Sequence, residues 1–347
     1  MAKHQPILDL RPSPYIHSPL SVNKIMRNVV YALLPLVAYS TWQFGISALA
    51  LMITTTLSCI LTEHFFCKLS AKKSTISDYS SVITGLLLAM TLPPGFPLWM
   101  AAVAGFVAIA MGKTLFGGIG FNVFNPALVG RAFVQAAFPV SITTWTPAFA
   151  ANRFSEFIPS TLALPFMKPA ATAEWSSQVA DGFSGATPLA LMKFQHIMTD
   201  TSDLLLGFTA GSAGETPALL ILLCGGYLAF RKMLDWRIPA AVIFGTAVSA
   251  EVFYLIDASH YPSPLFMILS GGLMFGAVFM ASDMVASPVT PLGIFVFGLL
   301  VGFLTVIIRL FGGLTEAVMY AILFGNAATP LIESFTQPKI YGARKKD

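Results

Sequence analysis

The sequence predicts an all-α polytopic membrane protein, with about ten transmembrane helices in a 5+5 inverted repeat and a large loop between the repeats. Three observations lead to this fold class. Hydrophobic residues make up 56% of the 347 residues and charged residues only 10%, against roughly 25% charged residues in an ordinary soluble domain. Apolar segments long enough to cross a bilayer recur along the chain. A pattern of motifs in the first half also returns in the second.

Composition excludes several classes of function. The formal net charge is only +4 and its distribution follows membrane topology, so we expect no nucleic-acid partner. The three cysteines lack Cys-x-x-Cys spacing and the five histidines lack helical pairing. These patterns predict neither a disulfide framework nor a metal or haem site. The proline-rich start has no signal-peptide pattern, so the first span is expected to act as the export signal.

Ten segments are expected as spans, because a bilayer core of about 30 Å needs roughly 20 apolar residues per helix. Some of them are shorter than this length, notably the third. The segments cover residues 25–44, 45–66, 79–92, 97–115, 122–141, 217–231, 238–256, 264–282, 291–310 and 314–334.

Positive charge indicates the orientation of these spans. If the N-terminus is cytoplasmic, most lysines and arginines fall on the inner side, and the outer side holds only Arg153, Lys168, Lys193 and Arg309. This asymmetry follows the positive-inside rule. It predicts a bacterial inner-membrane protein with a cytoplasmic segment (1–24), a first five-helix repeat (25–141), a periplasmic loop (142–216), a second repeat (217–335) and a cytoplasmic tail (336–347).

The second half of the chain echoes the first. The motifs Thr84-Gly85, Pro97-Leu98, Lys113, Phe116-Gly117-Gly118 and Asn125-Pro126 return as Ser270-Gly271, Pro291-Leu292, Arg309, Phe311-Gly312-Gly313 and, more loosely, Asn326 with Pro330. Because each unit holds five spans, the second is expected to be inverted, as in many transporters. The glycines of the third and eighth spans indicate either a central site or close helix packing alone.

The longest polar interval contains the motif Asp181-Gly-Phe-Ser184-Gly185-Ala186-Thr187-Pro188. Gly185 and Ala186 leave room around the Thr187 hydroxyl, and Pro188 suits the first residue of a helix. Thr187 is therefore expected at an N-cap. There, a phosphate on or near its oxygen would meet free backbone amides and the positive end of the helix dipole. The alternative is that Thr187 only caps a loop helix.

A second motif places Asn122 and Asn125 three residues apart, with Pro126 next and Arg131 six residues beyond Asn125. With this spacing at a helix start, the two amides are expected on one face. There they could bind the polar edge of a planar heterocycle such as isoalloxazine. The alternative is structural, with Asn122 capping the helix and Asn125 satisfying backbone groups left unpaired at Pro126.

Together, these motifs resemble those of a known family. Over essentially its whole length the chain is similar to the RnfD subunit of the Rnf ion-translocating oxidoreductase and, more distantly, to the NqrB subunit of the sodium-translocating NADH:quinone reductase. The pattern Asp181-x-x-Ser184-Gly185-Ala186-Thr187 looks like the recognition sequence of a flavin transferase that joins FMN to threonine through its phosphate. The resemblance implies covalent FMN on Thr187 as a phosphoester. It also implies noncovalent riboflavin near Asn122 and Asn125. The implied partners are other Rnf subunits, the flavin transferase and membrane lipid.

Ionisable residues inside the predicted spans are further candidates, because charges in hydrocarbon are costly. Asp283, Glu251 and Arg131 are candidates for an ion pathway, and Glu316 is suspect on the same ground. We expect Asp283 either near the two asparagines, because the repeat pairs these elements, or exposed in the loop that follows. Glu251 is expected either to bind the ion or to pair with Arg131.

The resemblance implies a membrane subunit of an electron-transport complex, which couples electron transfer through FMN to translocation of Na⁺ or H⁺. Such a subunit is not an enzyme on its own. No dinucleotide-binding glycine pattern follows a strand, so NADH or ferredoxin is expected to bind elsewhere in the complex. A small-solute channel or secondary transporter accounts equally well for the inverted repeat, and a scaffold subunit is a third interpretation.

Overall fold

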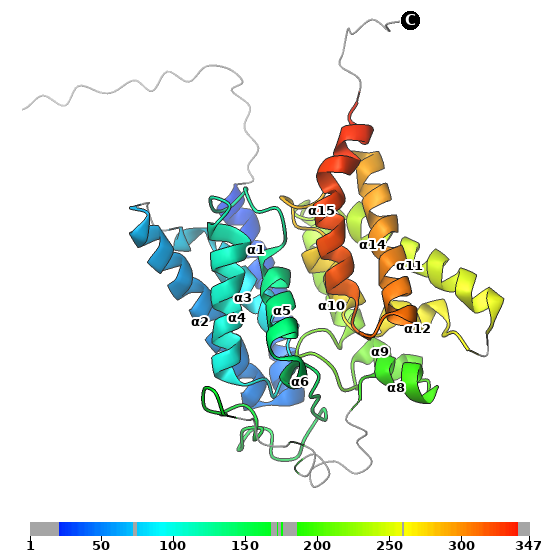
Figure 1. Cartoon of the computed structure of the whole chain (residues 1–347), viewed down its shortest axis with the longest axis horizontal. Helices are drawn as coiled ribbons and strands as arrows, with labels where there is room; N and C mark the ends of the chain where they lie inside the picture. The colour runs from blue at the N-terminus through cyan, green and yellow to red at the C-terminus, as the bar shows by residue number, and fades with distance from the viewer. Residues whose placement is uncertain are drawn as a thin grey trace, which may run out of the picture.

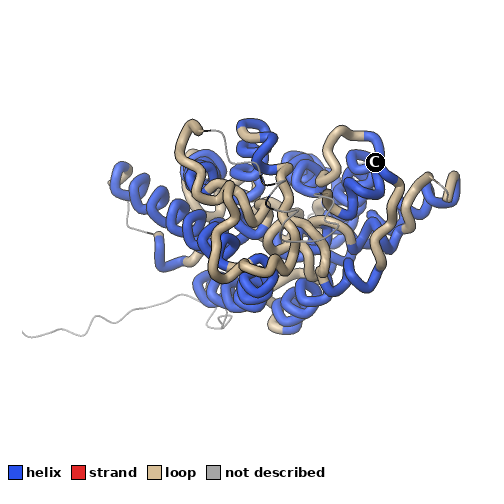
Figure 2. The backbone as a smooth tube through the Cα atoms, turned by 90° about the horizontal axis from the view of Figure 1, so that it is seen from below, coloured by secondary structure: helices blue, strands red, loops and turns tan. Residues whose placement is uncertain are grey.

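The computed structural model describes residues 21–71, 75–167, 172, 175, 186–258 and 260–338. Within this part of the chain, every regular element is a helix (Figure 2). The helices form two groups that stand side by side, one from each half of the sequence (Figure 1). The all-α class predicted from composition is confirmed.

The first group packs α3 and α4 against α2 through small residues. A Cβ on Gly85 of α3 would lie 2.5 Å from the Thr56 Cα, and one on Gly105 of α4 would lie 3.0 Å from the Thr55 carbonyl oxygen. Glycine therefore lets these backbones approach closely. The elements are α1 (Val22–Phe44), α2 (Ile46–Leu69), η1 (Ile76–Asp78), α3 (Ser80–Met90), α4 (Leu98–Ile109), the π-helical η2 (Ala110–Thr114), α5 (Pro126–Ala137) and α6 (Pro139–Ile142).

The second group is built around a close pair, α11 and α14. A Cβ on Gly302 would lie 2.5 Å from the Thr246 amide nitrogen, so the two helices touch along their backbones. The elements are α10 (Ala218–Phe230), α11 (Arg237–Ile256), α12 (Pro264–Leu269), α13 (Leu273–Phe275), the π-helical η3 (Gly276–Met280), α14 (Pro291–Phe311) and α15 (Val318–Thr336).

The predicted eighth span is not one helix. It breaks between α12 and α13, where Gly271 adopts φ +60°. The carbonyl oxygens of Met267 and Ser270 are not left unpaired at this break, because the buried Arg309 guanidinium donates to both. An arginine from α14 thus stabilises the interruption, which hydropathy alone does not reveal.

Helices occur in each of the ten predicted segments, but their lengths differ from the prediction. Among the described residues, four helices are long and apolar enough to cross a membrane, namely α2, α11, α14 and α15. The fifth segment, expected from Asn122, begins its helix only at Pro126 and is interrupted at Phe138. Glu316, expected inside a span, precedes α15. Ten spans and the 5+5 repeat therefore stay predictions.

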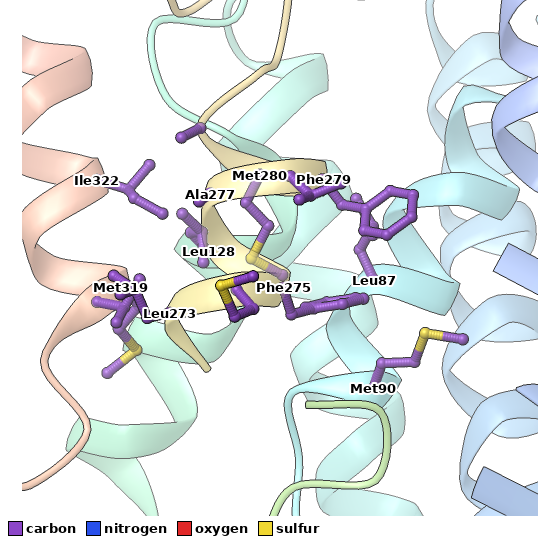
Figure 3. Packing of buried hydrophobic residues seen from close by; sticks show 14 of the residues in the cluster. Leu87, Met90, Leu128, Leu273, Phe275, Ala277, Phe279, Met280, Met319 and Ile322 are labelled. Atoms are coloured by element: carbon purple, nitrogen blue, oxygen red, sulfur yellow. The ribbon is translucent and has the colours of Figure 1, made fainter. Parts of the chain in front are cut away.

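The short pieces after the break fill the space between the two groups. Leu273, Phe275 and Met280 are almost fully buried, and Figure 3 shows them close to Leu87, Leu128 and Met319, which come from α3, α5 and α15. One continuous apolar cluster therefore spans both halves of the chain. Within a bilayer such a contact is stabilised mainly by close van der Waals packing.

Two short helices, α8 (Pro188–Gln195) and α9 (Thr201–Leu206), lie at the lower end of the molecule in Figure 1, whereas α1 begins and α15 ends at the upper end. Seen from below, loops run across this lower end (Figure 2). Residues 207–217 return from it into the interior. There the amides of Ala213 and Gly214 donate to the carbonyl oxygens of Leu92 and Met90 at 3.0 and 2.8 Å.

Candidate functional site

Thr187 is the N-cap of α8, as its sequence context predicts. Its backbone is extended (φ −73°, ψ 159°) and its Oγ1 accepts a hydrogen bond from the Ala190 amide at 3.3 Å. The side chain is buried, with 2% of the residue exposed. Ala186 is half-buried beside it, whereas Asp181, Ser184 and Gly185 lie outside the described residues.

A small cavity of about 20 Å³ lies beside the Thr187 side chain. Its other walls come from the segment after α9 and from the segments that precede α13 and α15. The polar and small residues that line it together with Thr187 include Ser212, Glu215, Gly271 and Glu316. The site therefore joins the loop between the halves to the second helix group.

Buried ion pairs connect this cavity to the first helix group. Arg131 of α5 donates to Glu215 Oε1 at 2.9 Å and also to Glu316 Oε2. It donates as well to the carbonyl oxygen of Thr91, which follows α3. Arg131 is 3% exposed and Glu215 8%, so each charge depends on its partners for stabilisation.

Glu215 lies in the connecting segment, outside the helices, and its environment is unusual for a carboxylate. Burial raises the pKa of its carboxyl to about 7, although the Arg131 charge acts to lower it. The carboxylate lies against the backbone of Gly272, where an added Cβ would be 2.5 Å from Oε1. Only glycine at that position leaves room for it.

At the opposite end of the helices, a cavity of about 130 Å³ holds the second predicted motif. The Asn122 side-chain nitrogen donates to the Phe124 carbonyl oxygen at 3.1 Å and to Asp283 Oδ2 at 3.3 Å. Asn125 caps α5 by accepting from the Ala127 amide, and it donates to the Met280 carbonyl oxygen at 3.2 Å. Polar groups are thus concentrated on one side of an otherwise apolar cavity.

A buried ion pair borders the same cavity. Lys113 donates to Glu63 Oε1 at 2.7 Å and to the Ser80 hydroxyl. The hydroxyl of Thr75 also donates to this Glu63 oxygen. Lys113, Ser80 and Asp283 all line the cavity, so a bound ligand would meet one cationic side chain, one carboxyl group and several hydroxyl or amide groups.

A further cavity of about 130 Å³ follows α8 along its length. Its lining includes Lys193, His196, His260 and Tyr261, and the two imidazole rings lie 5.3 Å apart between centroids. Lys193 donates to the carbonyl oxygens of Arg309 and Gly312 at the end of α14. Burial lowers the pKa of the Lys193 ammonium.

The structure brings some of the predicted residues together and separates others. The expected proximity of Asp283 to Asn122 is confirmed. The expectation that Asn122 and Asn125 share a helix face is wrong, because α5 begins only at Pro126. Asn125, rather than Asn122, is the cap. Glu251 is exposed on α11 and is not the partner of Arg131.

Sequence reasoning missed Glu215 and Glu63. The sequence predicts an outer loop at Glu215, yet this residue is buried against Arg131 of the first half and Gly272 of the second. The signal that could have found it is the small-residue run Gly211-Ser-Ala-Gly214 directly before Glu215. Such a run allows backbone to enter a packed interior. Glu63 belongs to α2, and in the sequence it resembles an ordinary charge near the end of a helix. Only the structure shows that Lys113 lies beside it.

The NQR2, RnfD, RnfE family model matches residues 9–342 of the chain. The chain belongs to this family. Its relatives include the D subunit of the proton-translocating ferredoxin:NAD(+) oxidoreductase complex of Clostridium ljungdahlii, 38% identical over 98% of this chain and 97% of the relative. The D subunit of the Na(+)-translocating complex of Acetobacterium woodii is 39% identical over 97% and 96%. The D subunit of the ion-translocating oxidoreductase complex of Halorhodospira halophila is 34% identical over 96% and 95%.

As a member of the NQR2, RnfD, RnfE family with four helices able to span a bilayer, the chain is a helical membrane protein. The residues around Thr187 suit a phosphate, because its oxygen already stands at a helix N-terminus, where anions are stabilised. A cavity of about 20 Å³ holds about one water. A phosphate group and a flavin ring would therefore both have to lie outside it.

Proposed function

We propose that this chain is an electron-carrying subunit of an ion-translocating oxidoreductase, with FMN joined to Thr187 as a phosphoester. The observation that carries the proposal is the N-cap position of Thr187, at the start of an eight-residue helix and within a complete flavin-attachment pattern. When bound, the flavin supplies a carrier that accepts and donates electrons. The chain supplies its position and its electrostatic environment.

The role of α8 follows from its geometry. Thr187 Oγ1 lies 3.3 Å from the Ala190 amide, so an esterified oxygen at this position stays beside the first backbone N–H groups of the helix. These groups and the helix dipole favour a negative phosphate by about 0.3–1 kcal/mol where the site is exposed, and by more where it is partly buried. Lys193 and Arg309, which line the cavity along α8, add positive charge nearby.

A second flavin, noncovalent riboflavin, is proposed for the cavity lined by Asn122 and Asn125. Both side-chain amides already have protein partners, so ring recognition would involve exchange or sharing of those bonds. Asp283 and Lys113 border the same cavity. In this proposal the Asp283 carboxylate is a hydrogen-bond acceptor for the edge of the ring, and the Lys113 ammonium is a donor.

The proposed setting is a bacterial inner membrane. The start of α1 and the end of α15 lie opposite α8 in the molecule (Figure 1), which supports termini and Thr187 on opposite sides of the membrane. The charge asymmetry favours cytoplasmic termini and a periplasmic Thr187. The proposed partners are the other Rnf subunits, a flavin transferase during maturation and surrounding lipid. The exposed apolar side chains of α2, such as Ile53, Leu57 and Leu61, suit contact with lipid or with apolar partner helices.

Coupling to Na⁺ or H⁺ translocation completes the proposal. Relatives are named for either ion, so the choice between them is an experimental question. Among the sequence candidates, Asp283 and Arg131 are part of polar clusters inside the molecule. Glu251 is exposed on α11, where a neighbouring protein of the complex would have to complete any ion site.

In-gel fluorescence of the denatured protein tests the flavin attachment. We expect flavin to remain on the wild-type chain only when a flavin transferase is co-expressed. Thr187→Ala should lose the fluorescence but still insert in membranes, whereas Thr201→Ala, an exposed threonine on the neighbouring α9, should retain it. A wild-type chain without adduct in the presence of the transferase would overturn the proposal and favour a solute channel or transporter. Unchanged electron transfer in a complex containing Thr187→Ala would favour a scaffold.

Riboflavin is tested separately, by releasing noncovalent flavin from the native protein with acid. We expect Asn122→Ala to lose this fraction and Asn152→Ala, a change at an exposed loop residue, to keep it. Equal flavin release from both variants would remove Asn122 from the proposed site.

A further inference from the structure

Two small cavities flank the buried charges at the junction of the two halves. Each has a volume of about 20 Å³, and Glu215 and Glu316 line both. A cavity needs roughly 10–15 Å³ to hold one water. Each therefore accepts a water molecule or an ion of similar size, and an organic solute is too large for either.

Glu215 presents an oxygen that the protein does not use. Its Oε1 accepts from Arg131, whereas Oε2 is buried and has no hydrogen-bond partner among the described residues. The Ser212 hydroxyl, 1% exposed, lies close enough to influence this carboxyl but without acceptable hydrogen-bond geometry. A buried carboxylate oxygen without a partner is costly, so it marks a position at which a ligand would be stabilised.

Charge balance indicates which ligand belongs there. Arg131 pairs with Glu215 and Glu316, and Arg309 attracts both carboxylates although it makes no ion pair within the described residues. When both carboxylates are ionised, the two cations and two carboxylates cancel. A phosphoester on Thr187, whose side chain lines one of the cavities, adds one negative charge beside that cavity. Lys193 lines a different cavity along α8 and donates to carbonyl oxygens at the end of α14.

We propose that Glu215 Oε2, the Ser212 hydroxyl and the Glu316 carboxylate bind one Na⁺ ion in the cavity beside Thr187, beneath the flavin phosphate. The inference rests on the proposed function, because the phosphoester supplies the remaining negative charge. Hard cations take oxygen ligands of this kind. Gly272 and Arg131 hold the Glu215 carboxylate from two sides, so its position is fixed before an ion binds.

The test measures equilibrium binding of radioactive Na⁺ to the full-length chain, co-expressed with a flavin transferase and purified in detergent with K⁺ as the background salt. We expect one Na⁺ per flavin-carrying chain at saturation. Loss of a ligand in Glu215→Gln should weaken binding about tenfold or more, by analogy with the cost of disturbing other metal sites. Glu156→Gln, which changes an exposed loop carboxylate, should bind like the wild type.

Ser212→Ala provides an independent arm, because it leaves the Arg131 ion pairs intact. It should weaken Na⁺ binding without loss of folded protein, whereas Ser202→Ala on α9 should not change it. Thr187→Ala should also bind Na⁺ more weakly, because it cannot carry the phosphate.

Flavin fluorescence of the same samples separates the two proposals. A chain without flavin contradicts the proposed function. A flavin-carrying chain that binds no Na⁺ contradicts the Na⁺ site, as does one in which Glu215→Gln and Ser212→Ala bind like the wild type. A Glu215-dependent response to pH alone, with no Na⁺ bound, also contradicts it.

Discussion

Lys113 is 4% exposed and satisfies its charge through Glu63 and Ser80. The three residues come from different helical elements of the first group, η2, α2 and α3. A buried ion pair of this kind contributes little net stability compared with apolar packing, but breaking it leaves one charge without compensation. The pair therefore constrains which residues can face each other.

We expect Lys113→Met to destabilise the protein by about 3–5 kcal/mol, because Glu63 remains buried without its partner. Thermal unfolding in detergent, followed by circular dichroism, measures the change. The double variant Lys113→Met with Glu63→Gln should recover part of the loss. An additive loss in the double variant would contradict the coupling.

Gly272 gives a second prediction at the scale of one residue. A methyl group there would lie 2.5 Å from Glu215 Oε1, so Gly272→Ala should cost about 1–3 kcal/mol through overpacking. Gly226 of α10 is the matched control, since an added Cβ meets nothing within 4 Å. Gly226→Ala should leave stability unchanged or raise it by up to about 1 kcal/mol. Equal effects of the two variants on the thermal midpoint would contradict this assignment.

Local chemistry was the most predictable part of the site. The cap at Thr187 follows from one hydroxyl, one proline and the helix behind them, so the sequence predicts it correctly. The partners of Arg131 were not predictable in the same way. Glu215 and Glu316 lie 84 and 185 positions away along the chain, and their pairing depends on how the two halves pack.

At the scale of an element, α5 shows why the asparagine motif was misjudged. Asn125 caps the helix through Oδ1 and uses its nitrogen to bind the Met280 carbonyl oxygen at the end of η3. Its amide therefore connects the start of one helix to the end of another. The residue types from Asn122 to Pro126 predict the start of a helix, but they do not show which asparagine caps it.

Substitution of Asn125 separates these two roles. Asn125→Ser keeps a short neutral oxygen for the Ala127 amide but lacks the amide group that donates to Met280, whereas Asn125→Ala loses both bonds. We expect Asn125→Ala to destabilise the protein by about 1 kcal/mol more than Asn125→Ser, the usual value of an N-cap. Chemical or thermal unfolding of the detergent-solubilised chain measures the difference. The same stability for both variants would mean that the cap contributes nothing.

The broken helix at α12 and α13 was also beyond sequence reasoning. Its apolar content predicts one span, and the glycines at 271 and 272 allow either a break or close packing. The contacts that stabilise the break come from Arg309, about forty residues away in another helix. Its guanidinium donates to carbonyl oxygens that have no helical partner at the break.

Across the whole molecule, the two helix groups share an apolar cluster and one charged junction. The junction makes stability depend on pH. Burial raises the pKa of Glu215 from 4.5 to about 7, so the folded protein binds its proton more tightly than the unfolded chain does. This contribution to stability is complete below about pH 4.5 and is lost as the pH rises through about 7.

We therefore expect the thermal midpoint of the wild type to fall relative to that of Glu215→Gln as the pH is raised from about 4.5 to about 7. The glutamine has no titrating proton, so the difference between the two curves isolates this carboxyl. Glu156→Gln should run parallel to the wild type. Parallel curves for the wild type and Glu215→Gln would contradict a raised pKa.

Fold class and membrane character were predictable from composition, because a chain with so few charges cannot cover a soluble surface. The arrangement of the two halves was harder to predict from the sequence. Repeat motifs predict an inverted pair, but the connecting segment at 207–217 is polar and glycine-rich, and it reads as an external loop. Its burial depends on hydrogen bonds to Met90 and Leu92, which are properties of the assembled molecule.

The burial of that segment bears on how the chain is made. Arg131 is synthesised and reaches the bilayer 84 residues before Glu215, and at an elongation rate of about 5–20 residues per second the delay lasts several seconds. During that interval the arginine has no carboxylate partner from this chain. A chain truncated between the two positions would lack both carboxylate partners of Arg131. The ion pair that joins the finished halves can thus form only after translation has passed Glu215.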